Sequence, residues 1–89
     1  MVDFCTAVLN YIKIDGLLVR DIAFDQVDQA AVRAIAQFAG ALNALTIAES
    51  VENADAIEKL RDLGVTHAQG YGVGAPVPLQ TLTKVGLPA

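Results

Sequence analysis

The chain has 89 residues and a net charge of −4, which allows one domain at most. Its Lys and Arg residues form no basic stripe, so we expect no nucleic-acid partner. A single cysteine, Cys5, excludes an internal disulfide, and no apolar stretch approaches the roughly 20 residues of a membrane span. We therefore expect a cytoplasmic chain without a membrane partner.

The first half of the chain predicts a strand over residues 11–15 and then a long helix. Asp25 is the expected N-cap of the helix, and Asn43 is expected to close it in the left-handed conformation. Apolar residues recur along the helix at spacings of three and four, so they predict one stripe that faces the core: Val27, Ala31, Ile35, Phe38 and Leu42.

The second half predicts a strand over residues 45–48 that ends at Glu49. A helix follows, which begins at the cap Asn53 and ends at Gly64. Residues 65–71 predict a third strand, residues 70–78 a loop rich in glycine and proline, and residues 79–84 a last helical turn. The order strand-helix-strand-helix-strand indicates parallel strands, either in an open α/β sheet or in a piece of a barrel.

Polar side chains occur where these strands would be buried or would end. Lys13 and Asp15 share one face of the first strand, where they pair with each other or contact a ligand. Glu49 and Glu52 at the end of the second strand are typical of a divalent metal site or a general base, but also of a solvated helix start. Gln69 in the third strand orients a ligand or satisfies backbone groups.

Four short motifs follow one another in an order that resembles the last part of EAL domains. They are Tyr-Ile-Lys-Ile-Asp-Gly at 11–16, Ile-Ala-Glu-Ser-Val-Glu at 47–52, Leu-Arg-Asp-Leu-Gly at 60–64 and Ala-Gln-Gly-Tyr at 68–71. The resemblance covers residues 11–82. It implies a (β/α) barrel that hydrolyses cyclic di-GMP with two divalent cations, Mg²⁺ or Mn²⁺.

The resemblance also implies roles for individual residues. Lys13 and Glu49 match the catalytic pair, in which the lysine holds the attacking water and the glutamate lies at the metal. Gln69 and Glu52 match residues that contact the substrate or support its loop. Asp15, Glu49 and, more remotely, Asp3 match metal ligands.

Several departures from the family pattern bear on activity. The E-A-L signature and the Asn and Glu ligands after it have no counterpart, and Ser50 replaces a loop glycine. We therefore expect residues 1–89 to form a single truncated domain related to cyclic di-GMP phosphodiesterases, without full hydrolytic activity by itself. The alternatives are a weak cyclic di-GMP binder or a non-catalytic module for oligomerisation or partner binding.

The expected fold class is α/β, as a partial TIM-like (β/α) barrel of three or four parallel strands with covering helices. Residues 2–6 are the candidate fourth strand. A partial barrel leaves open sheet edges, and 54% of the residues are hydrophobic, so we expect self-association, most simply as a dimer.

Overall fold

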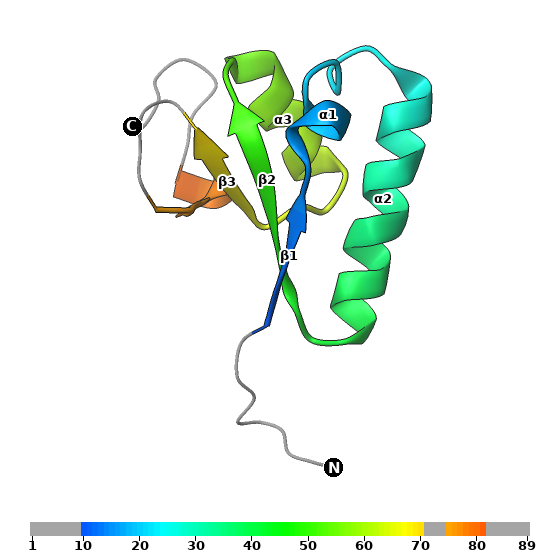
Figure 1. Cartoon of the computed structure of the whole chain (residues 1–89), viewed down its shortest axis with the longest axis vertical. Helices are drawn as coiled ribbons and strands as arrows, with labels where there is room; N and C mark the ends of the chain where they lie inside the picture. The colour runs from blue at the N-terminus through cyan, green and yellow to red at the C-terminus, as the bar shows by residue number, and fades with distance from the viewer. Residues whose placement is uncertain (1–9, 71–74, 82–89) are drawn as a thin grey trace.

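Three parallel strands make up most of a four-stranded sheet in the computed structural model, which describes residues 10–70 and 75–81 (Figure 1). The sheet order is β1-β2-β3-β4, with β1 Tyr11–Ile14, β2 Leu45–Val51 and β3 His67–Gly70 running parallel. The pairing places Ile14 beside Ala48 and Ala48 beside Ala68. The predicted parallel α/β sheet is therefore confirmed, as a fragment that does not close into a barrel.

The fourth strand differs from the prediction. It is β4, Val77–Pro78, and it pairs with β3 in the antiparallel direction. Antiparallel neighbours need no crossover helix between them. The sheet is thus mixed rather than wholly parallel, and the candidate strand at residues 2–6 lies outside the described residues.

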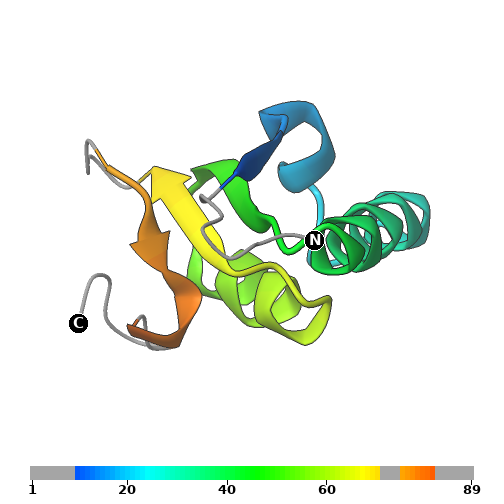
Figure 2. The ribbon, with the colours of Figure 1, turned by 90° about the horizontal axis from the view of Figure 1, so that it is seen from below.

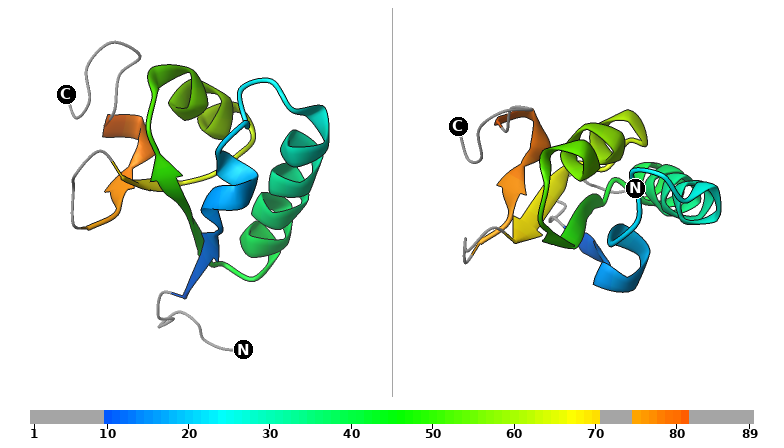
Figure 3. Two further views of the ribbon diagram at one scale, coloured as in Figure 1. Left: turned by 45° about the horizontal axis from the view of Figure 1, so that its top comes forward. Right: turned by 90° about the horizontal axis from the view of Figure 1, so that it is seen from above.

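Helices cover one face of this sheet (Figure 2). The two long ones are α2, Gln26–Ala41, and α3, Ala54–Asp62; a short α1, Gly16–Val19, follows β1, and a 3₁₀ turn, Leu79–Thr81, follows β4. The two views of Figure 3 show the opposite face of the sheet without a covering helix. None of the helices in the described ranges has the length and apolar character to cross a membrane.

The predicted helix ends are confirmed. The side chain of Asp25 accepts a hydrogen bond from Asp28 N at 3.0 Å, and that of Asn53 accepts one from Ala56 N at 2.8 Å. Asn43, with a φ of 58°, and Gly64, with a φ of 96°, have the left-handed conformation that ends a helix.

The predicted inner stripe of α2 is wrong at three positions. Val27 is 78% exposed, Phe38 62% and Leu42 55%. The residues that pack towards the sheet form a neighbouring stripe: Val32, Ile35 and Ala39. The helix has apolar residues around more than half of its circumference, so periodicity alone could not decide which stripe faces the core.

The core lies between the sheet and the helices. It is built from aliphatic side chains of β1, β2, α3 and the segments that join them, including Ile14, Ile22, Ala48, Val51, Ile57 and Leu60. Thr46 is the buried polar residue of the described ranges, and its N–H, its C=O and its hydroxyl each have a hydrogen-bond partner.

Candidate functional site

The ends of the three parallel strands bring three predicted site residues together. Lys13 of β1, Glu49 of β2 and Gln69 of β3 line one hollow of about 350 Å³, together with Ser50 and Gly70. Lys13 is exposed, whereas Glu49 and Gln69 are half-buried. The hollow thus offers one cation, one carboxylate and one amide on the face of the sheet that no helix covers.

A β-bulge shapes this hollow. Between the pairs Ala48–Ala68 and Val51–Gly70, strand β2 has two residues, Glu49 and Ser50, where β3 has only Gln69. A regular strand would place residues 48 and 51 on opposite faces, yet both are buried in the core. The bulge therefore returns Val51 to the core while it leaves Glu49 beside Gln69.

Ser50 makes the bulge possible by adopting a left-handed φ of 62°. The EAL pattern has a glycine at this position, and the serine has the backbone conformation that glycine favours. Gly70 completes the arrangement, since it has a φ of 143° and a Cβ there would lie 2.4 Å from Val51 O.

A hydrogen-bonded pair of threonines fixes the register of β2 against β3. The Thr66 hydroxyl accepts from Thr46 N and donates to Thr46 O, and the Thr46 hydroxyl accepts from Thr66 N, each at 2.9 Å. Glu49 lies three residues beyond Thr46, and Gln69 lies three residues beyond Thr66. The register that the threonines set therefore decides which side chains meet at the strand ends.

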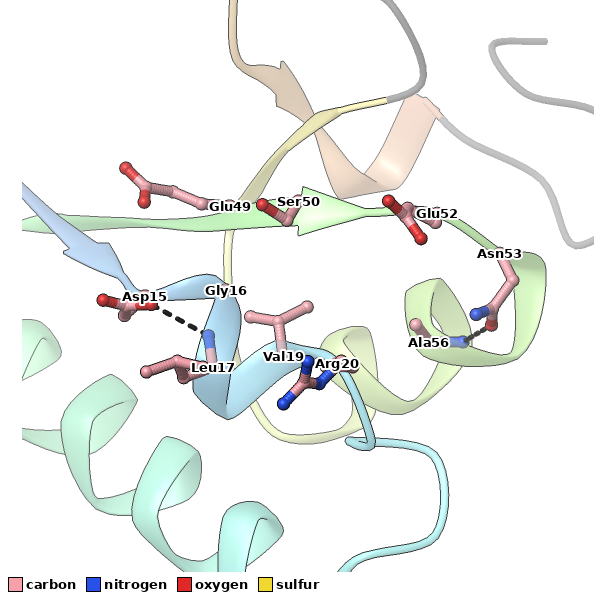
Figure 4. Close-up of a pocket in the computed structure, with 10 residues that line it drawn as sticks. All are labelled: Asp15, Gly16, Leu17, Val19, Arg20, Glu49, Ser50, Glu52, Asn53 and Ala56. Atoms are coloured by element: carbon pink, nitrogen blue, oxygen red, sulfur yellow. Dashed lines mark hydrogen bonds between the residues drawn. The ribbon is translucent and has the colours of Figure 1, made fainter.

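A second hollow, of about 370 Å³, adjoins the first on the helix side (Figure 4). Asp15 and Glu49 lie at one end of it and Glu52 at the other. Arg20, directly after α1, also lines the hollow. Glu49 lines both hollows, whereas Glu52 lines only this one and does not meet Gln69. Arg20 was not predicted as a site residue, because a single arginine after a short apolar run carries no recognisable signal.

The expected metal site is not complete in the part of the chain that the structure describes. No group of three or more His, Cys, Asp or Glu side chains there has an arrangement that could hold a metal ion. Asp15 uses Oδ1 to accept a hydrogen bond from Leu17 N at 2.8 Å, which caps α1. Asp3 lies outside the described residues. The described donors therefore do not fit Mg²⁺ or Mn²⁺, which take several oxygen ligands.

Comparisons with known proteins agree with this geometry. The family model described as EAL domain matches residues 3–76. The cyclic di-GMP phosphodiesterase PdeB of Shewanella oneidensis is 39% identical over 71 residues, which are 80% of this chain and 8% of PdeB.

Two solved structures share the fold. One is the manganese and cyclic di-GMP complex of Klebsiella pneumoniae BlrP1, with a TM-score of 0.69 and 30% identity over 79% of this chain and 18% of that chain. The other is the cyclic di-GMP-bound form of a standalone EAL protein from Vibrio cholerae, with a TM-score of 0.67 and 33% identity over 79% of this chain and 30% of that chain. The chain thus spans less than a third of each of these three proteins.

Proposed function

Because the chain belongs to the EAL domain family, we propose that it is a partial EAL barrel that binds cyclic di-GMP weakly and does not hydrolyse it by itself. The observation that supports this proposal is the hollow shared by Lys13, Glu49 and Gln69. Relatives and structural neighbours are described as cyclic di-GMP phosphodiesterases or as cyclic di-GMP complexes.

Each of the three side chains has a chemical role in the proposed site. The Lys13 ammonium attracts a phosphate oxygen or holds a water beside it. The Glu49 carboxylate accepts a proton or a hydrogen bond from that water. The Gln69 amide both donates and accepts, so it orients a polar group of the ligand.

The same geometry argues for weak binding. A cyclic dinucleotide carries two phosphate charges, and among the described residues the hollow opposes them with one cation, Lys13, next to the anionic Glu49. The chain also has a net charge of −4. Hydrolysis in the family depends on divalent metal, and the described donors do not form a site for it.

Titration of the 89-residue chain with cyclic di-GMP, followed by NMR or calorimetry, tests the binding. We expect saturable binding that weakens as salt is raised, and binding roughly tenfold weaker in Lys13→Met, because the charge-assisted contact is lost. Arg33→Met, which removes an exposed cation on α2, is the matched control and should bind as the parent does.

Product analysis with Mg²⁺ or Mn²⁺ tests the second half of the proposal. We expect no linear dinucleotide above the background without protein. Turnover that disappears in Glu49→Gln would show that the chain is an active phosphodiesterase and would contradict the proposal.

A second candidate function is a non-catalytic module that oligomerises or binds a partner. The exposed apolar residues of α2 favour it. Absence of both binding and turnover, in a chain that is folded by circular dichroism, would support this candidate instead. A pair of copies is the proposed assembly in either case.

A further inference from the structure

The second hollow combines apolar side chains with a charged rim (Figure 4). Val19 and Ala56 line it although both are almost fully buried, so they lie at its bottom. Leu17 adds an apolar side chain that is 70% exposed. Arg20 and Glu52 are exposed residues of the rim. A ligand with apolar faces and a polar edge suits such a hollow.

The charged groups of the rim are not paired with one another. Neither Arg20 nor Glu52 forms an ion pair or a side-chain hydrogen bond with any residue in the described ranges. Asp15, by contrast, already accepts a hydrogen bond from Leu17 N, and Glu49 also belongs to the first hollow. Arg20 and Glu52 are therefore the donor and the acceptor that are left for a ligand in the second hollow.

Guanine presents partners for both groups side by side. Its N1–H and N2–H groups donate to a carboxylate, and its O6 and N7 atoms accept from the N–H groups of a guanidinium. Adenine has a lone pair at N1, which would face the carboxylate, and a donor at N6, which would face the guanidinium. Arg20 and Glu52 thus suit guanine and oppose adenine.

We propose that the second hollow binds one guanine base of the ligand, with Glu52 accepting from N1–H and N2–H and Arg20 donating to O6 and N7. The inference rests on the proposed function for its ligand. The two hollows adjoin and share Glu49 and Ser50. One nucleotide therefore reaches both, with its phosphate beside Lys13 and its base in the second hollow.

The charge of the second hollow favours the base over the phosphate. Asp15, Glu49 and Glu52 line this hollow together with the cation Arg20. A phosphate there would meet more negative than positive charge, whereas a guanine base is neutral and offers N–H donors to the acids. The base would also cover the exposed side chain of Leu17, and this burial favours binding.

Comparison of cyclic di-GMP with cyclic di-AMP tests the selectivity, since the two ligands have the same sugar–phosphate ring. We expect the parent chain to bind cyclic di-GMP roughly tenfold more tightly or better, because one bidentate pair supplies discrimination of this order. Arg20→Lys keeps the charge but not the planar fork, so it should lose most of this preference. Glu52→Gln should lose it too, because an amide has one acceptor oxygen and lacks the charge.

Matched controls make the same chemical changes away from both hollows. Arg33→Lys changes an exposed arginine of α2, and Asp62→Asn changes an exposed acid of α3. Both variants should keep the parent's affinity for each ligand. Circular dichroism confirms that all four variants are folded.

Two-dimensional NMR of the whole chain separates this inference from the proposed function. We expect cyclic di-GMP to shift the signals of Lys13 and Gln69 in the first hollow and those of Leu17 and Ala56 in the second. Guanosine monophosphate should also shift the second set, and adenosine monophosphate should leave that set unchanged.

Binding of cyclic di-GMP that shifts only the first set, or equal affinity for cyclic di-AMP, would overturn the guanine site and leave the proposed function standing. The same holds for a preference that Arg20→Lys or Glu52→Gln retains in full. Shifts of the second set by guanosine monophosphate, without binding of cyclic di-GMP, would support the guanine site and overturn the proposed function. No response to either guanine ligand would overturn both.

Discussion

Gly16 and Ser50 lie so close together that a Cβ on Gly16 would be 2.8 Å from the Oγ of Ser50 and 3.0 Å from its Cβ. Gly16 begins α1 directly after β1, and Ser50 is the left-handed residue of the β2 bulge. The contact therefore joins the ends of two neighbouring strands at the rim where Glu49 lies. A side chain at position 16 therefore fits only if the residue at position 50 is smaller than serine.

The first prediction concerns this pair. Ser50→Gly should raise the free energy of unfolding by about 1 kcal/mol, because a left-handed φ costs a non-glycine residue about that much. Gly16→Ala should lower it by about 1–2 kcal/mol in the parent through overpacking. In the Ser50→Gly background, Gly16→Ala should be neutral or stabilising, since alanine is the better helix former.

Urea unfolding of the two single variants and the double variant measures the coupling. We expect an interaction free energy of about 1–2 kcal/mol, within the range of about 0.5–3 kcal/mol for residues in contact. Additive effects within about 0.5 kcal/mol would mean that the two side chains do not meet in solution.

The second prediction concerns the close approach of Gly70 to β2. Gly70→Ala would place a Cβ 2.4 Å from Val51 O, in a backbone with a φ of 143°. We expect a loss of at least about 2 kcal/mol, or an unfolded chain, because both the strain and the clash involve backbone atoms. Gly40→Ala is the matched control.

Gly40 lies in α2, and a Cβ there would meet no atom within 4 Å. The control should therefore gain about 0.5–1 kcal/mol, the difference in helix propensity between the two residues. Circular dichroism and urea unfolding compare the two variants. Equal stability of Gly70→Ala and the parent would rule out the bulge as described.

The third prediction concerns the threonine pair. Thr66→Val removes the hydroxyl that accepts from Thr46 N and donates to Thr46 O. We expect the free energy of unfolding to fall by about 2 kcal/mol, because a buried N–H and a buried C=O then lack a partner. The urea midpoint should fall while the slope of the transition stays the same.

Thr81→Val makes the same chemical change at an exposed position, where the hydroxyl donates to Pro78 O. It should change stability by less than about 0.5 kcal/mol. A Thr66→Val variant as stable as Thr81→Val would show that the threonine pair does not hold β2 and β3 in register.

Local signals in the sequence predicted the helix ends well. Asp25 and Asn53 cap their helices through their own side chains. Asn43 and Gly64 each have the left-handed conformation two residues after the end of their helix. Each of these effects depends on a few neighbouring residues, so a single sequence contains the necessary information. The meeting of Lys13, Glu49 and Gln69 was also predictable, because parallel strands end at one edge.

Features that depend on distant contacts were not predictable. The wrong stripe of α2 follows from a helix that is apolar on two sides, since only the sheet decides which side is buried. Strand β4, Val77–Pro78, has two residues and α1 has four, so both are too short to produce a periodic pattern. The bulge at Ser50 depends on Gly70, which lies 20 residues further along the chain.

The two edges of the sheet differ in how readily they accept another strand. Strand β4 ends in Pro78, which has no N–H, so a strand added beside it would lack a bond at that position. A fibre that grows by edge-to-edge pairing needs two sheet edges that accept new strands. Among the described strands, β1 provides one such edge, and β4 provides an edge that pairs poorly. Growth of a fibre by repeated pairing of sheet edges is therefore disfavoured.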